Sequence, residues 1–441
     1  MPSELTLSLL IGPGGVPLPV PPEVMESLMS ASVTQSASGT SGFDLSFAVS
    51  KGSLLLSLLA AGYFDPTTRV ILFALTPGTL TVLMDGVITL QELVPSDEPA
   101  KSTLSLKGDD LTRMLDLVDL TGFPWAAMPA EVRVTEMVAK YSALYGLVPL
   151  VVPSVLMDVP NPTALIPVQR GTDLTYIKTL AAQVGYDFFI QPGPLPGMNL
   201  AYWGPVLRTP IPFLAAPPPL AINWDGASNV ESLQFSFDGF KKTQWVVWTQ
   251  LDGEDIPIPV PEVNPISPPL GLKLPPAFKV STMSGLAKYS AVQAGAIALA
   301  KAASTANVVS GRGTLDVLRY GSILPTRTIV DVCGAGIAYD GQYFVESTTH
   351  TIKSGSYKQS FTLSRNALIA DPLAHLVSAV QSAAGAAVQQ LTGLAAPAGA
   401  VPLTLPGGVG LVTSPPGPTL PAPVPSAPGN TGRIAALPAS P

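Results

Sequence analysis

Apolar and polar residues alternate in several short runs of the chain, and this period of two predicts half-buried β-strands. Turn residues separate the first four runs, which are FDLSFAV (43–49), RVILFAL (69–75), TLTVLMDG (79–86) and VITLQEL (87–93). A fifth run, KSTLSLKG (101–108), leads into a helix that we expect to begin at Asp109 or Asp110, because acidic residues stabilise the positive end of a helix dipole. In the preceding Pro-, Ser- and Gly-rich segment, 10–42, the pattern predicts a short helix at Glu23–Met29.

Helical periodicity appears in the middle of the chain. EVRVTEMVAKYSALYGL (131–147) places apolar residues at helical spacing and ends on a glycine. GTDLTYIKTLAAQVGYDFFI (171–190) begins with Thr172 or Asp173 as a candidate cap, ends its helix at Gly185 and continues as a strand. The two helices and this strand predict a small α+β module.

Strand patterns return after this module and repeat the layout of the first strands. The runs are VESLQFSFDGF (230–240), TQWVVWTQL (243–251), RTIVDVCGAG (327–336), GQYFVESTTHTI (341–352) and SYKQSFTLSRNAL (356–368). In both units a strand follows a proline turn at Pro77 or Pro325, a glycine-containing turn leads to a long strand, and a polar turn leads to a strand that enters a helix.

We therefore predict an α+β, mainly β chain with two tube-like β-barrel domains. The predicted parts are a first barrel at 1–124, an α+β linking module at 125–226, a second barrel at 227–370 with a Pro-rich and helical insertion at 252–310, and a C-terminal helix with a Pro/Ala-rich tail at 371–441.

The composition indicates surfaces that partners cover. Of 441 residues 47% are hydrophobic and 12% charged, against about one quarter charged in an ordinary soluble domain. The net charge of -7 argues against nucleic-acid binding. Cys333 is the only cysteine, so no disulfide framework is expected.

The sequence shows no targeting or membrane segment that we would expect to be used. No basic region precedes LTLSLLIG, so we expect no signal peptide. Two lysines interrupt the apolar stretch 283–303, which favours a soluble helix over a membrane span.

Motifs for catalysis or cofactor binding are weak. The chain has two histidines, His350 and His375, and neither has a cysteine or acidic partner nearby in sequence. CGAG (333–336) lacks the third glycine and the helix of a dinucleotide loop, and SGRG (310–313) lacks the Lys-Ser/Thr of a phosphate loop. A Cys333–His350 pair across a hairpin is the one nucleophile arrangement to weigh. We predict no catalytic, cofactor-binding or metal-ligating residues and no cofactor.

Acidic pairs and tryptophans are the other candidates. The carboxylate pairs are Asp109 with Asp110, Asp116 with Asp119, and Glu254 with Asp255. A glycosidase needs two carboxylates on opposite sides of a cleft, whereas adjacent acidic residues at a helix start are explained by capping. Trp245 and Trp248 would face opposite sides of a strand, which favours packing over a sugar platform.

Five segments together resemble the baseplate tail-hub proteins of contractile phage tails and extracellular contractile injection systems, the late-control-D-like family that includes the hub half of type VI spike proteins. The segments are ELTLSLLIGP (4–13), VLMDGVITLQEL (82–93), IPVQRGTDL onward to Pro205 (166–205), SNVESLQFSFDG (228–239) and GQYFVESTTHTIKSGSYKQSFTLSRNAL (341–368). The resemblance covers about residues 1–370, and 166–205 is its most specific part.

The resemblance implies a structural baseplate hub, not an enzyme. Such hubs are homotrimers in which two barrels per chain form a pseudo-sixfold ring that joins the hexameric inner tube to the trimeric spike. The implied partners are the spike, inner-tube proteins and other baseplate components, with membrane contact left open. The implied location is an assembled injection particle made in the bacterial cytoplasm, with release from the cell left open.

The chain departs from fused hub–spike proteins because no spike domain is recognisable after residue 370, so we expect the spike to be a separate chain. Residues 373–394 have apolar residues at spacings of four and three, which predicts a helix. This helix either forms a three-stranded axial bundle or packs on its own subunit, with a membrane-lying helix as a third option. The alternative functions are a baseplate-associated peptidoglycan hydrolase and a carbohydrate-binding particle component.

Overall fold

In a computed structural model of the chain, the structure describes residues 6–13, 15–76, 79–98, 102–126, 128–154, 166–205, 217–224, 226–251, 254–261, 268–286 and 291–370. The chain divides into two units, Met1–Leu391 and Thr392–Pro441, and every described residue belongs to the first. The predicted helix 373–394, His375 and the Pro/Ala-rich tail lie outside the described residues.

Strands dominate the described chain, and most of them belong to one large sheet. The N-terminal part contains β1 (Thr6–Gly12), β2 (Leu18–Pro19), α1 (Pro22–Glu26), β3 (Leu28–Ser36), β4 (Gly42–Val49), α2 (Leu54–Ala60), β5 (Arg69–Thr76), β6 (Thr79–Val94), β7 (Ser102–Asp110) and a 3-10 helix (Leu111–Asp116). The C-terminal part contains β11 (Leu220–Ala221), β12 (Ser232–Phe237), β16 (Val309–Asp316), α6 (Val317–Tyr320), β17 (Ile329–Cys333), β18 (Gly341–Lys353) and β19 (Ser356–Arg365).

The two parts repeat one strand topology within this sheet. The order of β12-β16-β19-β18 is followed by β3-β4-β7-β6 in the same sense. In each part a short helix, α2 or α6, leads to a strand that pairs with the following long strand, as β5 does with β6 and β17 with β18. The internal repeat expected from the sequence is thus present as a repeat of pairing.

The predicted turn between residues 86 and 87 is wrong, because β6 continues through it as one strand of 16 residues. The first half of β6 pairs with β5 and the second half with β7, and Gly86 and Val87 pair with both neighbours. A Cβ on Gly86 would lie 2.3 Å from the carbonyl oxygen of Asp109, so the glycine allows close strand approach and makes no turn.

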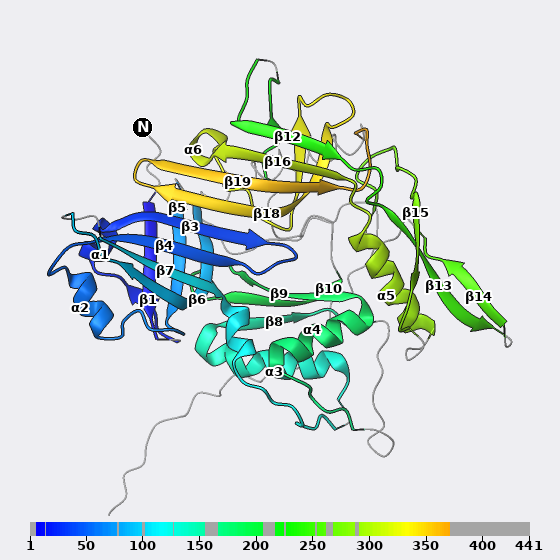
Figure 1. Cartoon of the computed structure of the whole chain (residues 1–441), viewed down its shortest axis with the longest axis horizontal. Coiled ribbons are helices and arrows are strands. Elements are labelled where there is room, and N and C mark those ends of the chain that lie inside the picture. The colour runs from blue at the N-terminus through cyan, green and yellow to red at the C-terminus, as the bar shows by residue number, and fades with distance from the viewer. Residues whose placement is uncertain are drawn as a thin grey trace, which may run out of the picture. The chain divides into compact units, whose positions relative to one another are not determined.

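The expected pair of separate barrels is also not found. β18 pairs antiparallel with β3 through seven residue pairs, from Ser347↔Ser36 to Lys353↔Ser30, so both parts share one 13-stranded sheet. The described strands form no closed barrel. Figure 1 shows this joint where the yellow β18 runs beside the blue β3. Sequence periodicity finds strands, but it does not show that strands some three hundred residues apart pair.

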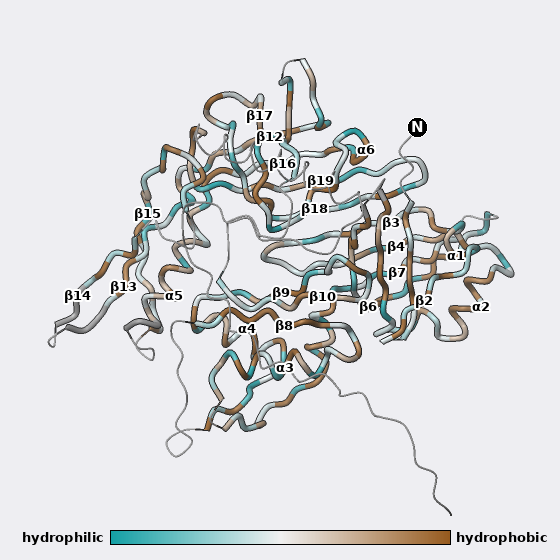
Figure 2. Tube along the Cα trace, turned by 180° about the vertical axis from the view of Figure 1, so that it is seen from behind, coloured by the Kyte–Doolittle hydropathy of each residue, from teal (hydrophilic) through white to brown (hydrophobic). Residues whose placement is uncertain are grey.

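The sheet buries one face and exposes the other. The buried residues form one core that spans both parts and includes Val33, Leu45 and Leu106 from the first part and Val345 and Leu363 from the second. Along β3, β4 and β7, brown hydrophobic segments alternate with pale or teal ones (Figure 2). This alternation is the period of two that predicted the strands.

A smaller α+β module lies between the two parts in sequence. It comprises α3 (Ala130–Tyr145), β8 (Leu147–Val151), α4 (Asp173–Val184), β9 (Tyr186–Pro192) and β10 (Asn199–Pro205), with the sheet order β8-β10-β9. Both predicted helices are confirmed: Thr172 caps α4 by accepting a hydrogen bond from the Thr175 amide, and Gly146 and Gly185 end the helices with left-handed backbone. The helices pack on one face of this sheet (Figure 1).

A third group of elements overlaps the insertion predicted at 252–310, but it also includes the strand at 243–251, which we expected in the second barrel. It contains β13 (Thr243–Leu251), β14 (Glu254–Pro259), β15 (Lys279–Met283) and α5 (Ala291–Ser304), and its strands form a separate three-stranded sheet in the order β14-β13-β15. The Pro-rich segment of the predicted insertion therefore contributes β14. α5 packs against α4 closely enough that a Cβ on Gly185 would lie 2.7 Å from the Ala300 Cβ.

A buried ion pair fastens the module to the large sheet. The Arg69 guanidinium donates to both carboxylate oxygens of Asp85, at 2.8 and 2.7 Å, and both side chains are almost fully buried. Arg69 Nη2 also donates to the Tyr145 carbonyl at 2.9 Å, and Asn199 Nδ2 donates to Asp85 at 2.7 Å. Strands β5 and β6 are thereby joined to the end of α3 and the start of β10.

We expect Arg69→Met or Asp85→Asn to lower the free energy of unfolding by about 3 to 5 kcal/mol, because each leaves a buried group without its charged partner. The double variant Arg69→Met/Asp85→Asn should cost less than the sum of the two single changes. Urea unfolding followed by the fluorescence of the buried Trp125 and Trp203 measures both. Single costs below about 1 kcal/mol would contradict the anchoring role.

Candidate functional site

The exposed face of the large sheet is lined with small polar side chains. In the second part it carries Ser232, Gln234, Ser236, Arg312, Thr314, Ser347, Thr349, Ser360 and Thr362, which alternate with core-facing residues along β12, β16, β18 and β19. The equivalent positions of the first part are Ser30, Ser32, Thr34, Asp44, Ser46, Glu92, Ser105 and Lys107. We call this continuous surface the polar face.

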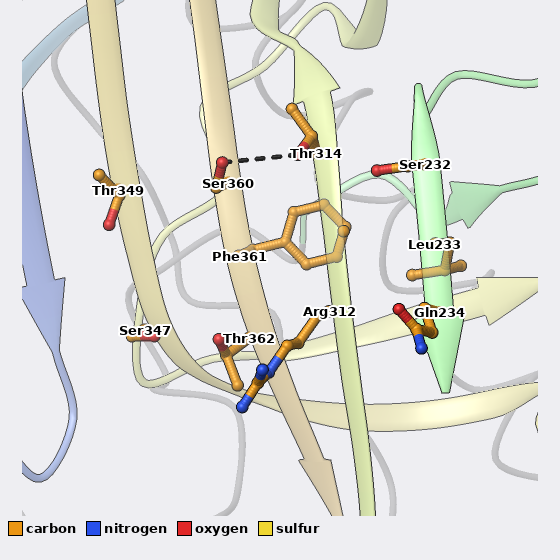
Figure 3. Close-up of a pocket in the computed structure, with 11 residues that line it drawn as sticks. Ser232, Leu233, Gln234, Arg312, Thr314, Ser347, Thr349, Ser360, Phe361 and Thr362 are labelled. Atoms are coloured by element: carbon orange, nitrogen blue, oxygen red, sulfur yellow. Dashed lines mark hydrogen bonds between the residues drawn. The ribbon is translucent and has the colours of Figure 1, made fainter. Parts of the chain in front are cut away.

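The polar face is hollowed over β12, β16, β19 and β18. The hollow has a volume of about 380 Å³, and its rim and floor include Gln234, Arg312, Thr349 and Thr362 (Figure 3). The Thr314 and Ser360 hydroxyls lie 3.5 Å apart across neighbouring strands. Hydroxyl groups and one guanidinium can bind water and polar surfaces, but they provide no nucleophile–base pair.

Charge on the polar face of the first part is partly balanced, with one lysine against two carboxylates. Lys107 Nζ lies 3.9 Å from a carboxylate oxygen of Asp44 and 3.9 Å from one of Glu92, and all three side chains are about half exposed. Exposed ion pairs of this kind contribute little to stability. Their effect is to keep the face close to neutral, as the low charge content of the chain predicts.

The structure separates Cys333 from His350. Cys333 ends β17 beside the start of β18, whereas His350 lies nine residues beyond Gly341 and pairs with Gln359 and Val33. Nine residues of strand correspond to roughly 30 Å. Burial, followed by the carboxylates of Asp331 and Asp340, raises the pKa of the Cys333 thiol. The pair is not a nucleophile and base.

His350 has a structural environment at the joint of the two parts. The residue is 1% exposed, and its Nδ1 lies 2.8 Å from the Tyr357 hydroxyl. Burial lowers the pKa of His350 to about 4. The imidazole is therefore neutral at pH 7 and faces the core that the two parts share.

The candidate carboxylates are dispersed and engaged in local structure. Asp109 is a residue of β7, and Asp110 caps the 3-10 helix by accepting a hydrogen bond from the Thr112 amide at 3.0 Å. Asp116 accepts one from Thr172 Oγ1 at 2.6 Å, and Asp119 accepts one from the Thr121 amide at 2.8 Å. Glu254 and Asp255 belong to β14, where they pair with Leu251 and Gln250.

Both glycine motifs, CGAG and SGRG, belong to the strand structure and form no ligand-binding loop. CGAG ends β17 and turns into β18, with Gly334 and Gly336 in left-handed backbone, so the predicted β-hairpin is confirmed. SGRG lies inside β16, a strand that periodicity did not reveal. A Cβ on Gly311 would lie 2.9 Å from the Phe235 ring and one on Gly313 2.5 Å from the Phe361 ring, so the glycines accommodate aromatic residues of neighbouring strands.

The two tryptophans of β13 lie on opposite sides, as expected. Trp245 packs toward α5, where its Nε1 donates to Thr305 Oγ1 at 2.9 Å and Lys301 lies over its ring. Trp248 is 52% exposed. The pair does not form a common platform for a sugar.

Arg327, a cation of the second part that the sequence did not single out, contacts the first part and the α+β module. Its Nη2 donates to the Ser36 carbonyl at 2.6 Å, and its guanidinium lies 3.9 Å from the centre of the Phe189 ring. Burial lowers the pKa of Arg327 to about 10, and Asp187 and Asp110 oppose that shift. Its signal in the sequence is slight, since Arg327 was one residue of a predicted strand.

No group of three or more His, Cys, Asp and Glu residues suited to a metal ion occurs in the described part of the chain. Within the same residues, no helix is long and apolar enough to span a membrane.

No protein-family model and no curated protein matches the sequence, but solved structures match the fold. The chain is similar to the 43 kDa tail protein of prophage MuSo2 from Shewanella oneidensis, with 12% identity, a TM-score of 0.55 and coverage of 82% of this chain and 100% of that chain. It is similar to a tail protein from Neisseria meningitidis MC58, with 13% identity, a TM-score of 0.52 and coverage of 82% and 96%. A chain of the Francisella PdpA–VgrG complex matches at 9% identity and a TM-score of 0.51, with coverage of 84% and 59%. The fold is therefore one found in phage tail proteins and in a VgrG complex.

We expect the stability of the protein to fall between pH 6.5 and pH 4 because of His350. The folded pKa of about 4 lies below the unfolded value of 6.5, so unfolding takes up a proton in this window. The loss should be roughly 2 kcal/mol at pH 5 relative to pH 7.5. His350→Gln, which keeps a partner for Tyr357 but does not titrate, should lose about that much less. Urea unfolding of both proteins at the two pH values measures this, and equal losses would refute the assignment.

Proposed function

We propose that the protein is a structural baseplate hub of a contractile injection system or phage-tail-like particle. Three copies would form an adaptor between a hexameric inner tube and a trimeric spike. The observation that carries this proposal is the translational repeat of four strands, β12-β16-β19-β18 and β3-β4-β7-β6, within one sheet.

Symmetry explains why the repeat supports this function. A ring of three chains, each with two nearly equal four-strand units, would offer six similar surfaces to a sixfold neighbour. Elements present once per chain, the α+β module and the β13–β15 insertion, would offer three surfaces to a threefold partner. The two tube-like domains expected from the sequence would then be the halves of this sheet, closed only in the assembly.

The polar face supports the same function. It is continuous across the β18–β3 joint and contains mostly serine and threonine hydroxyls, and the charged side chains named on it, Asp44, Glu92, Lys107 and Arg312, sum to zero. Such a surface suits the inner wall of a tube through which other molecules pass without binding. The expected partners are therefore the spike, the inner-tube proteins and other baseplate components, inside an assembled particle.

The shared fold is in keeping with this proposal, because tail proteins of a Shewanella prophage and of Neisseria match over most of their length. The match with a chain of the PdpA–VgrG complex covers 59% of that chain. A hydrolase would need two carboxylates facing one cleft, and none of the candidate carboxylates lines the hollow on the polar face. We therefore place the function in assembly.

We expect the purified full-length chain to have a mass of about 137 kDa, three times 45.6 kDa, by light scattering coupled to size exclusion. A second chain that ends at Ala370 tests the predicted axial helix. Trimers of both chains would assign assembly to residues 1–370, and a trimer of the full-length chain alone would assign it to the segment after Ala370. A monomer at high concentration, alone and with a candidate spike, would contradict the hub function.

A further inference from the structure

We propose that the outer edge of β6, Leu90–Val94, pairs antiparallel with Gln234–Asp238, the outer edge of β12 and the residue after it, in a second copy of this chain. The register places Glu92 opposite Ser236. This inference rests on the proposed hub function, since it defines the seam by which three chains would close a ring. It goes further in naming which residues meet.

One chain already contains an equivalent strand pairing, between β18 and β3. The second half of β18, Ser347–Lys353, pairs with β19 on one side and with β3 on the other. In the repeat β6 corresponds to β18 and β12 to β3. The second half of β6 pairs with β7 and β12 pairs with β16, and no described strand pairs with the remaining edge of either.

A β-bulge at the same place in both long strands aligns them. The β6–β7 register shifts between Ile88 and Leu90, and the β18–β19 register shifts between Val345 and Ser347. Leu90 is therefore equivalent to Ser347. Counting along the strands makes Glu92 equivalent to Thr349.

Following the cross-strand pairs from β6 and from β18 shows which residues of β3 and β12 are equivalent. Leu90 pairs with Lys107 and Ser347 with Thr362, so these two partners are equivalent. Lys107 pairs with Asp44, which pairs with Ser32. Thr362 pairs with Arg312, which pairs with Gln234. Ser32 is thus equivalent to Gln234, and Thr34, two residues on, to Ser236.

The residue pairs between β18 and β3, applied to the equivalent residues of β6 and β12, give the register between two copies. Thr349 pairs with Thr34 inside the chain, and their hydroxyl oxygens lie 3.1 Å apart. The equivalent pair between copies is Glu92 with Ser236. The neighbouring pair, His350 with Val33, becomes Leu93 with Phe235.

The two edges have side chains suited to burial. Leu90, Leu93 and Val94 are 50%, 40% and 51% exposed, and Phe237 on β12 is 42% exposed. An apolar open edge of this kind is a template for pairing with another chain. The register also brings Glu92 of one copy to the edge beside which Arg312 of the next copy lies, so the charges are complementary.

Three copies would bring three times eight strands into one sheet. At a strand spacing of about 4.8 Å, a closed ring of that size is about 40 Å across at the backbone. Each copy would contribute one β6 edge and one β12 edge, so the ring closes with no edge left.

Disulfide cross-linking tests the register. Cys333→Ala gives a background without cysteines, and Glu92→Cys with Ser236→Cys then places one thiol on each edge. Within one chain the two positions lie at opposite ends of eight strands, roughly 34 Å apart across the sheet, so a bond between them joins two copies. After mild oxidation we expect a threefold increase in mass on a non-reducing denaturing gel, with no band above the trimer.

Two matched pairs control the experiment. Thr34→Cys with Thr349→Cys, the internal seam, should form a bond within one chain without a change in mass. Glu92→Cys with Ser232→Cys, displaced by four residues or about 13 Å along β12, should give no cross-link.

Light scattering of the unoxidised Glu92→Cys/Ser236→Cys protein separates the two proposals. A trimer that does not cross-link at Glu92 and Ser236, or that cross-links equally well at Ser232, would overturn the register and leave the hub function standing. A monomer that does not cross-link would overturn both. A ladder that continues past the trimer would overturn closure of the ring.

Discussion

The backbone hydrogen bonds between β18 and β3 are the constraint on which the rest of this structure depends. They join the two repeats, make one hydrophobic core of two, and extend the polar face from one half to the other. Their register is critical, because a slip by one residue would turn His350 toward the polar face and Thr349 toward the core. The ion pair of Arg69 and Asp85 has the complementary role of holding the α+β module against this sheet.

The sequence was informative where the pattern is local and failed where it is not. The helices near 131–147 and 171–185 follow apolar periodicity and end on glycines, and both occur as expected. β3 and β16 escaped detection because serine, threonine and glycine dominate them. Those small residues are what the polar face and its close strand approaches require, so the feature that weakened the strand signal belongs to the candidate site.

The hydrophobic periodicity of the sequence could not predict the continuous strand β6 or the β18–β3 joint, for a different reason. Nothing in the residues around 86 and 87 distinguishes a turn from a strand that changes partners, because glycine serves both. The same holds for the joint between the halves, which depends on pairing between segments far apart in the chain. The sequence therefore predicted two general properties of the polar face, its low charge and the repeated strand layout. The residues that form it could be named only once the strand registers were known.

Buried polar groups in this fold connect parts. Arg69, Arg327 and His350 each lie where two or three parts meet, and each is satisfied mainly by carbonyls, carboxylates or hydroxyls of the structure itself. Directional interactions at such joints favour one arrangement of the parts over others. The polar face, in contrast, carries few charged side chains.

The separation of β3 and β18 along the chain also sets an order for folding during synthesis. Thr34 and Thr349 are 315 residues apart, and at about 5 to 20 residues per second the ribosome needs roughly 15 to 60 s to make the second after the first. Throughout that time the outer edge of β3 has no partner from its own chain. An unpaired edge attracts other nascent chains, so the yield of this protein should depend on temperature and on chaperones that shield β3.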